Sequence, residues 1–198
     1  MKTWEHIFLI DTSRSMAPVH ADNSISECIQ GIIKTFRTWP RLCELVVISI
    51  YTYNESVSCI FKKKSLFELT EISKFICENK SNLKSGIDYL KSTCEAISLK
   101  KDSYDYLPTL TIFTGIYPSE SFTIEDLEFL RDNFAVGTGI EDFVKSPEDP
   151  NWNWRNSPII ATSRNLSVQE HFKRHFERVY SYENIDEFVN MYTMYANE

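Results

Sequence analysis

Short apolar runs alternate with helical segments along the chain, and this alternation restricts the possible folds more than any other feature. Residues 6–10 (His-Ile-Phe-Leu-Ile) are typical of a central strand that is buried on both faces. Further strands are predicted at 44–53, 57–61, 107–113, 134–137 and 179–182. Strands separated by helices indicate an α/β fold with a doubly wound, mainly parallel central sheet and helices on both faces.

One strand pair departs from the parallel pattern. The turn signal at 54–56 (Asn-Glu-Ser) joins 44–53 to 57–61, so these two strands are predicted to form a hairpin with one antiparallel edge strand. Residues 66–79 fit a short helical and an extended interpretation equally well. A chain of 198 residues that is 42% hydrophobic supports one core, so we expect a single domain over 1–198 with an irregular acidic loop at 141–157.

Helix starts are marked by capping residues. A helix is predicted to follow Ser24 and to end before Pro40, and another is predicted to begin at Ser81 or Asn82. Closing helices are predicted at 168–177 and 185–192. Two capping boxes are expected, at Ser24 with Glu27 and at Ser167 with Glu170, and Thr123 with Asp126 is expected to cap a further helix.

The charge distribution argues against nucleic-acid binding. Residues 1–110 carry 14 basic and 13 acidic side chains, whereas residues 111–198 carry 7 basic and 15 acidic ones. An acidic half of this kind repels a phosphate backbone. The one basic run, Lys62 to Lys64, is interpreted as the solvated end of a strand.

Composition also limits location and chemistry. No stretch approaches the ~18 apolar residues of a membrane span, and the N-terminal residues contain no cleavable apolar region. Five widely spaced cysteines without a Cys-x-x-Cys pair are expected to be reduced core residues of a cytoplasmic protein. They form no Cys/His/Asp arrangement, so we expect the protein not to be an enzyme.

Chemistry concentrates in the loop that follows the first strand. Asp11, Ser13 and Ser15 alternate there, and ligands of open α/β sheets bind at the carboxyl ends of strands. One carboxylate and two hydroxyls suit a hard cation such as Mg²⁺, which accepts oxygen ligands and retains several waters. The alternative is that these side chains only satisfy backbone groups of the loop.

These motifs resemble those of the von Willebrand factor A (vWA) family. Asp-x-Ser-x-Ser at 11–15 resembles the metal-ion-dependent adhesion site (MIDAS) of that family. Residues 81–87 resemble its second segment, 108–115 the strand that normally ends in Thr-Asp-Gly, and 44–54 the strand after the first helix. The pattern, including Asp-Tyr-x-Pro at 105–108, is most similar to bacterial tellurium-resistance-associated domains of the TerY type, over residues 5–140.

The resemblance implies a protein-interaction module with a divalent-cation site. Asp11, Ser13, Ser15 and Ser81 fill the family's ligand positions, but Gly115 stands where the family has an aspartate. The site is therefore expected to be partly degenerate and to hold Mg²⁺ weakly or with a partner's acidic side chain. Glu120 is a candidate replacement ligand. The resemblance further implies a bacterial stress-response or defence role, with kinase-like or phosphatase-like proteins as partners.

The sequence leaves three alternatives. A metal-dependent phosphohydrolase of the haloacid dehalogenase type also has an aspartate here, but Ser13 occupies the position of its acid–base aspartate.

His171 and His175 share a helix face, but the motif is incomplete, so a surface pair is preferred over a zinc site. Trp152 and Trp154 are interpreted either as a partly buried loop core or as a contact surface.

Overall fold

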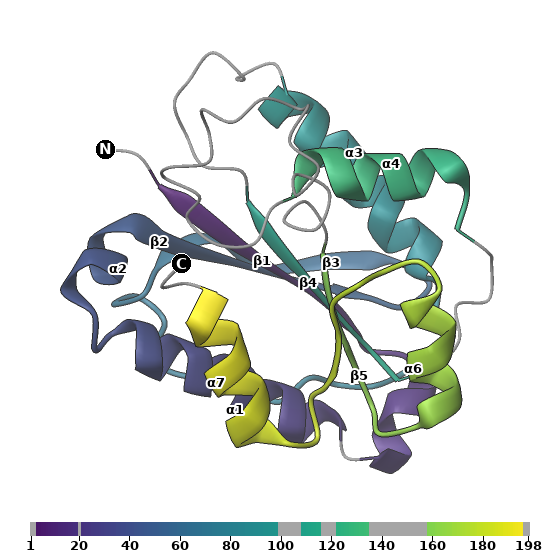
Figure 1. Cartoon of the computed structure of the whole chain (residues 1–198), viewed down its shortest axis with the longest axis horizontal. Coiled ribbons are helices and arrows are strands. Elements are labelled where there is room, and N and C mark those ends of the chain that lie inside the picture. The colour runs from purple at the N-terminus through teal and green to yellow at the C-terminus, as the bar shows by residue number, and fades with distance from the viewer. Residues whose placement is uncertain (1–2, 20, 99–107, 116–121, 135–157, 196–198) are drawn as a thin grey trace.

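A six-stranded sheet in the order β3-β2-β1-β4-β5-β6 forms the centre of the molecule (Figure 1). The structure, a computed structural model, describes residues 3–19, 21–98, 108–115, 122–134 and 158–195. Its strands are β1 (Trp4–Asp11), β2 (Val46–Tyr53), β3 (Val57–Ser65), β4 (Thr109–Thr114), β5 (Ile159–Thr162) and β6 (Val179–Ser181).

The predicted sheet is confirmed in type. Neighbouring strands are parallel throughout, except that β3 pairs antiparallel with β2 and forms one edge. All eight residues of β1 are buried because the strand lies between β2 and β4 and is covered on both faces. The apolar run at 6–10 predicted this central position.

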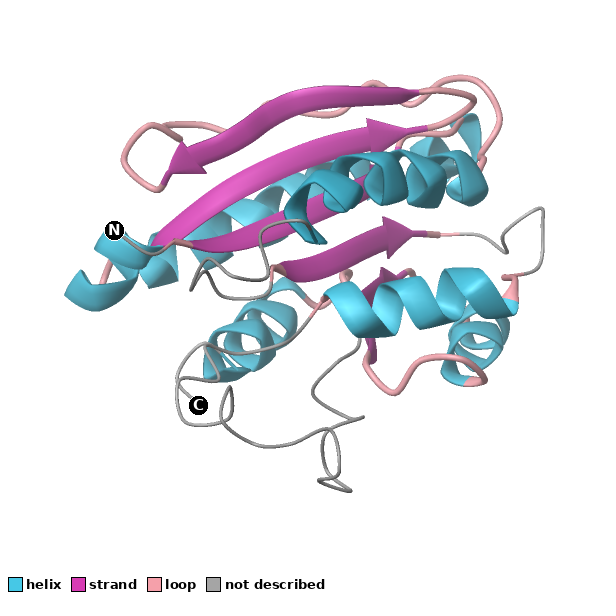
Figure 2. Ribbon diagram, turned by 90° about the horizontal axis from the view of Figure 1, so that it is seen from above, coloured by secondary structure: helices cyan, strands magenta, loops and turns pink. Residues whose placement is uncertain are grey.

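Helices cover both faces of the sheet, as the sequence predicted. The helices are α1 (Ala21–Phe36), α2 (Pro40–Leu45), α3 (Leu83–Ser98), α4 (Ile124–Asn133), α6 (Leu166–Lys173) and α7 (Ile185–Tyr195), with a 3₁₀ helix at Arg14–Val19. Figure 1 shows α1 and α7 on one side of the sheet and α3 and α4 on the other, and Figure 2 shows both layers from above. Each face has its own apolar core, one containing α1 and α7 and the other α3, α4 and α6.

Two element predictions were incomplete. Pro40 was expected to follow a helix and to precede a strand at 44–53, but it occupies the first turn of α2, and β2 begins only at Val46. Proline suits this position because its missing N–H would have no partner in the first turn. The strand β5 was not predicted. Of the strand predicted at 134–137, Phe134 lies after α4 as a buried residue, and 135–137 fall outside the described residues.

The capping predictions were right at one of three helices. Thr123 and Asp126 cap α4 as expected, and they do so as a capping box. The other two were wrong, because α1 begins at Ala21, upstream of Ser24, and because Asn165 rather than Ser167 caps α6. The Asn165 side chain accepts the Ser167 and Val168 N–H groups, so α6 starts and ends earlier than predicted.

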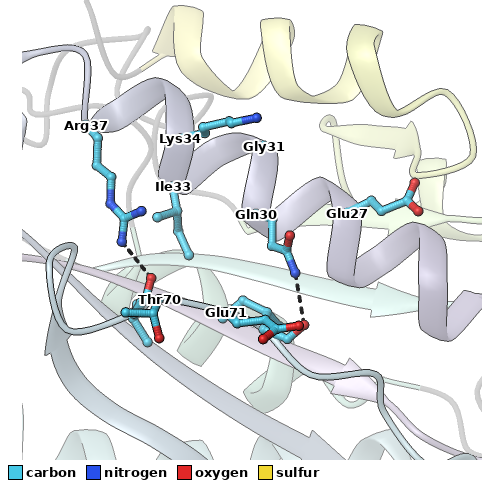
Figure 3. A pocket seen from close by; sticks show the side chains of 10 residues that line it. Glu27, Gln30, Gly31, Ile33, Lys34, Arg37, Thr70 and Glu71 are labelled. Carbon is cyan, nitrogen blue, oxygen red and sulfur yellow. Dashed lines mark hydrogen bonds between the residues drawn. The ribbon is translucent and has the colours of Figure 1, made fainter.

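The connector, residues 66–82 between β3 and α3, begins with a turn at 66–68 and contains neither helix nor strand; it is held mostly by side chains of α1 and of Arg37, which directly follows α1. The Arg37 guanidinium donates to the Leu66 and Leu69 carbonyls, and Gln30 Nε2 donates to the Ile72 carbonyl at 3.0 Å. Figure 3 shows Arg37 and Gln30 reaching across to this segment beside a hollow of about 280 Å³. The short helical interpretation of 66–79 is therefore wrong, and the segment is an irregular stretch that follows a turn at 66–68.

The far end of the connector is bonded to the loop after β1. Glu78 N–H donates to the Thr12 carbonyl at 2.8 Å, and Arg14 N–H donates to the Asn79 carbonyl at 3.0 Å. Asn79 has a φ of 63°, a left-handed conformation that asparagine tolerates better than most residues. The chain therefore turns at Asn79 and brings Ser81 to the end of β1.

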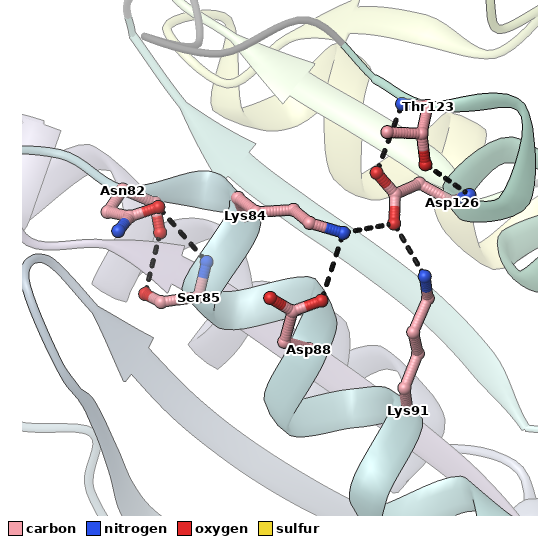
Figure 4. A network of polar contacts seen from close by, with 7 residues as sticks. All are labelled: Asn82, Lys84, Ser85, Asp88, Lys91, Thr123 and Asp126. Carbon is pink, nitrogen blue, oxygen red and sulfur yellow. Dashed lines mark hydrogen bonds and ion pairs between the residues drawn. The ribbon is translucent and has the colours of Figure 1, made fainter.

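A buried carboxylate joins α3 to α4. Asp126 is fully buried, and its Oδ1 atom lies 2.6 Å from both Lys84 Nζ and Lys91 Nζ of α3 (Figure 4). Burial alone would raise the pKa of Asp126, but the hydrogen bonds from these two lysines outweigh burial and hold it below its ordinary value of 3.8. The Thr123 backbone N–H adds a further donor, so this carboxylate both caps α4 and pairs the two helices.

Candidate metal site

Asp11 ends the central strand at the place where the chain changes its winding direction. The chain runs outward from β1 to β2 and β3 and then returns to β4 on the other side of β1. The loops that follow β1 and β4 lead to helices on opposite faces, and open α/β sheets bind their ligands at such a point. Asp11 lies there with only 1% of its surface exposed, opposite Tyr53 of β2.

The Asp11 carboxylate gathers donors from three separate segments. The Ser13 N–H donates to Oδ1 at 2.8 Å, and the Ser81 hydroxyl donates to Oδ2 at 2.8 Å. The Thr114 hydroxyl, at the end of β4, lies 3.4 Å from Oδ2. Burial raises the pKa of Asp11, whereas these hydrogen bonds act to lower it. The structure thus brings Asp11, Ser13 and Ser81 together at the end of β1.

Ser15 joins this cluster through Ser13. The two hydroxyl oxygens lie 2.8 Å apart, and the turn that brings them together is closed by the Met16 N–H donating to the Ser13 carbonyl at 2.9 Å. Ser13 is buried and Ser15 is exposed, so the cluster extends from the interior to the surface. All four predicted residues form one connected group.

Within each hydrogen-bonded pair of the group, the two oxygens are about as far apart as neighbouring ligands of a six-coordinate cation. Adjacent ligands around Mg²⁺ lie about 3.0 Å apart when each is ~2.1 Å from the ion. The oxygen pairs Ser13–Ser15, Ser81–Asp11 and Thr114–Asp11 are 2.8, 2.8 and 3.4 Å apart. A bound cation would thus replace hydrogen bonds between oxygens that are already close together. The residues fit a hard divalent cation, but they supply only one carboxylate.

Two buried tyrosine hydroxyls near Asp11 support a polar ligand at this site. Both side chains are fully buried; in the described part of the chain the Tyr182 hydroxyl has no hydrogen-bond partner, whereas the Tyr53 hydroxyl lies within hydrogen-bonding reach of Thr114 and Ser81. Burial, together with the nearby negative charge of Asp11, raises the pKa of both groups, and Glu183 adds to the shift at Tyr182. Both therefore stay protonated and can donate to water or a carboxylate.

Gly115 occupies a confined position beside this cluster. A Cβ atom on Gly115 would lie 2.8 Å from Met16 Sδ and 3.2 Å from Tyr182 Oη. Met16 is itself fully buried, so its thioether fills the space in front of the glycine. The family's second carboxylate is absent in sequence, and an apolar side chain occupies the space next to its position. Glu120, the candidate replacement, lies outside the described residues.

We predict that Gly115→Asp destabilises the chain by about 1–3 kcal/mol, because the added side chain enters a filled core. The same substitution should cost less in a Met16→Ala background, where the thioether is gone. Urea unfolding of the four proteins measures this coupling. An equal loss of unfolding free energy in both backgrounds would show that Met16 does not block the position. The sequence also predicts that Gly115→Asp tightens cation binding, and this affinity is best measured in the Met16→Ala background.

Sequence reasoning missed several residues of this site. Thr114 was recognised only as part of a strand, and neither tyrosine hydroxyl nor Met16 was considered. Tyr182 lies in sequence far from the Asp11 loop and reaches it only through the order of the strands. The one available signal was Tyr53, because it ends the predicted strand that neighbours the first strand.

Two further features that the sequence predicted are the histidine pair and the tryptophan loop. The rings of His171 and His175 lie 6.0 Å apart; His171 is half-buried and His175 is exposed, which agrees with a surface pair. In the ranges that the structure describes, no three His, Cys, Asp or Glu side chains gather as a metal site. Trp152, Trp154 and the acidic loop 141–157 fall outside those ranges.

Cysteine and lysine positions were predicted with one error. Cys28 is buried and Cys43 and Cys77 are half-buried, but Cys59 is exposed, because it lies on the edge strand β3. None of these four is in a disulfide with another described cysteine. Lys62 to Lys64 are exposed on the same strand, as expected. Among the helices described, none has the length and apolar character needed to cross a membrane.

The comparisons with known proteins identify the fold. No family model and no curated protein matches the chain. Three solved structures show related folds. Proximal thread matrix protein 1 from the mussel byssus, with a zinc-occupied MIDAS motif, matches with a TM-score of 0.61 and 10% identity over 96% of this chain. The ArnB paralog VWA2 from Sulfolobus acidocaldarius matches with a TM-score of 0.51 and 12% identity over 96%. The VWA domain of SpRpn10 matches with a TM-score of 0.52 and 12% identity over 90%.

These neighbours share the arrangement of elements rather than the sequence. This chain spans 45% of the mussel protein and 44% of the archaeal one, but 86% of the SpRpn10 VWA domain. At 10–12% identity the comparison identifies the fold, which is that of a vWA domain. The Asp11 cluster lies at the end of the central strand of this fold.

Proposed function

We propose that this chain is a protein-interaction module of the vWA type, without enzymatic activity, whose Asp11 cluster binds a divalent cation together with a partner's carboxylate. The observation that carries the proposal is the convergence of Asp11, Ser13, Ser15 and Ser81 in one group of closely spaced oxygens. A cation bound there would supply a positive charge to which a carboxylate of the partner adds as a further ligand.

The chain's own residues determine how strongly the cation is held. Asp11 supplies the only carboxylate of the cluster, and Met16 fills the space beside Gly115. With one formal negative charge, Mg²⁺ is held weakly in the isolated protein, with a Kd of about 10⁻³ M or weaker. The zinc-occupied MIDAS motif of the mussel protein supports a divalent cation at such a site and leaves Mg²⁺ as our proposal for this chain.

The biological setting follows from the sequence resemblance. Similarity to the TerY type favours a cytoplasmic protein of a bacterial stress-response or defence system, in which kinase-like or phosphatase-like proteins are candidate partners. The four described cysteines form no disulfide with one another, which agrees with a reducing compartment.

The alternative, a phosphohydrolase that uses Asp11 as its nucleophile, is less favoured by the geometry. Asp11 is 1% exposed, and its two oxygens already accept hydrogen bonds from Ser13 and Ser81. A nucleophile must reach a phosphoryl group, and the second aspartate that would carry the proton is replaced by Ser13. Turnover of p-nitrophenyl phosphate with Mg²⁺ that disappears in Asp11→Asn would establish the enzyme instead.

Cation titration of the full chain tests the proposal. We expect Mg²⁺, and separately Zn²⁺, to shift the backbone amide NMR signals of Ser13, Ser15 and Ser81. We also expect proteins captured from a bacterial lysate in Mg²⁺ to be released by EDTA and not to be captured by Asp11→Asn. Shifts confined to other parts of the chain, or capture that is indifferent to both treatments, would contradict the proposal.

A further inference from the structure

A second surface feature lies directly beside the Asp11 loop. The cleft is a hollow of about 320 Å³ between the β2–β3 hairpin and residues 72–78 of the connector. Thr12, the residue that follows Asp11, is one of the residues that line it. The lining combines five apolar side chains, Ile60, Phe61, Ile72, Phe75 and Ile76, with polar ones that include Lys74 and Glu78. This volume is at the lower limit of the ~300–1,000 Å³ typical of small-molecule pockets, so the cleft suits one large side chain better than a cofactor.

The cleft leaves unusually large apolar groups open to solvent. Ile76 is 79% exposed and Ile60 is 47% exposed, and both line the cleft. Solvent-exposed isoleucines around a hollow gain free energy when an apolar group covers them. An apolar side chain anchored in a pocket is also the usual centre of a protein interface.

The charge around the cleft defines the chemistry of the partner. The loop 12–16, the hairpin residues 52–61 and connector residues 72–82 contain three basic residues and two acidic ones, Glu55 and Glu78, although the whole chain carries a net charge of −7. Lys74 and Glu78 line the cleft, and Arg14 and Lys80 lie in the adjoining segments. The three bases, Arg14, Lys74 and Lys80, are exposed, and none forms an ion pair with another described residue. A locally basic surface on an acidic protein attracts acidic segments and repels its own counterpart on a second copy.

The edge strand itself is a poor template for adding another strand. The pairing of β3 with β2 shifts register twice, between Ile48 and Ile50 and again between Ile50 and Tyr51. Lys63 has a φ of 49° at the first shift. Bulges and lysines of this kind are devices by which edge strands avoid pairing with other chains. A segment that docks here therefore depends on side-chain contacts in the cleft.

We propose that the cleft is a docking site for an extended acidic segment of a partner protein. One large apolar side chain of that segment enters between Ile60 and Ile76, and its carboxylates face Arg14, Lys74 and Lys80. The inference deepens the proposed function and rests on it in one respect, namely that the partner is the one whose carboxylate reaches the Asp11 cation. The cleft contacts themselves require no cation, so the two contributions can be measured separately.

Selection from a phage-displayed library of random 12-residue peptides tests this proposal on the full chain. The unmodified chain is the target, and an Ile60→Ser/Ile76→Ser variant removes peptides that bind elsewhere. Both substitutions are at exposed positions, so the variant is expected to fold normally. Enriched peptides should combine Asp or Glu with a large apolar residue. No enrichment, or enrichment of basic peptides, would overturn the proposal.

Fluorescence anisotropy of one labelled selected peptide then locates the contacts. Ile76→Ser should weaken binding at least fivefold and Lys74→Glu at least tenfold, in EDTA as well as in Mg²⁺. The matched controls are Ile124→Ser, at a 75% exposed isoleucine of α4, and Lys173→Glu, at an exposed lysine of α6, and both should bind as the unmodified chain does. Equal affinities for Ile76→Ser and Ile124→Ser would overturn the docking site.

The experiment separates the cleft from the cation site. If Asp11→Asn alone abolishes binding and the cleft variants bind normally, the proposed function stands and the cleft proposal fails. If the cleft variants weaken binding but Asp11→Asn and EDTA have no effect, the cleft proposal stands without the cation. The cleft could instead hold a second copy of this chain, which analytical ultracentrifugation tests. A dimer of the unmodified chain that dissociates in Ile76→Ser would show that a second copy fills the cleft.

Discussion

Asp11→Asn should abolish divalent-cation binding and leave the chain folded. The substitution removes the only carboxylate of the cluster, and the loss of one charge a few Å from a divalent ion costs on the order of several kcal/mol at an effective dielectric near 20. The asparagine oxygen can still accept the Ser13 N–H, and its amide can donate to the hydroxyls of Ser81 and Thr114. We therefore expect a change in unfolding free energy of less than about 1 kcal/mol without cation.

Calorimetric titration with Mg²⁺ and thermal unfolding with and without the cation measure the two effects. The unmodified chain should unfold at a higher temperature in Mg²⁺, whereas Asp11→Asn should show no such gain. Ser163→Ala is a suitable control, because Ser163 is a buried serine that follows β5 and has no contact with Asp11 among the hydrogen bonds of the described residues. Unchanged cation binding in Asp11→Asn would mean that the cluster is only a hydrogen-bonded loop.

Asp126→Ala should produce the largest loss of stability, about 3 kcal/mol. It removes a fully buried carboxylate that pairs with two lysines and caps α4. Lys84 and Lys91 are 29% and 26% exposed at their side chains, so they regain water in part and the loss stays at the lower end for broken buried pairs. Urea unfolding measures it. Asp88→Ala is the matched control, because Asp88 also contacts Lys84 but is exposed, and its loss should be below about 1 kcal/mol.

The same carboxylate should make the fold sensitive to acid. The pKa of Asp126 is lower in the folded chain than its ordinary value of 3.8, so the unfolded chain binds this proton more readily. Its stabilising contribution is complete above pH 3.8 and is lost as the pH falls through 3.8 toward the lowered pKa. Asp126→Asn should therefore lose less stability than the unmodified chain below pH 4. Parallel losses in both proteins would show that other carboxylates dominate acid unfolding.

The elements that were predicted correctly have strong local signals. Residues 6–10 are apolar without interruption, and the turn at 54–56 lies between two β-rich runs, so strand and hairpin were both recognisable. The strand β5 was missed because it has only four residues and follows a polar stretch. The helix α2 was not predicted because Pro40 was interpreted as the end of a helix, although proline is also common in the first turn of a helix.

The residues of the candidate site also fall into two groups, those that the sequence predicts and those that it does not. Asp11, Ser13 and Ser15 lie within five residues, and Ser81 precedes a recognisable helix, so their approach could be inferred from fold type alone. The positions of Tyr182 and Met16 depend on strand order and side-chain packing, which no local pattern encodes. Whether an aspartate fits at Gly115 is for this reason a three-dimensional question.

Many positions of the connector can be substituted with little loss of stability. Arg37, Gln30 and Ser26 all donate to its main-chain carbonyls, and every residue type offers a carbonyl whatever its side chain. Only the inward-facing residues, such as Ile72, must stay apolar. The outward-facing positions between them are thus free to diversify while Ser81 keeps its place. Substitutions at these positions could give a related protein a new partner during evolution. A binding peptide could likewise be grafted there without a redesign of the core.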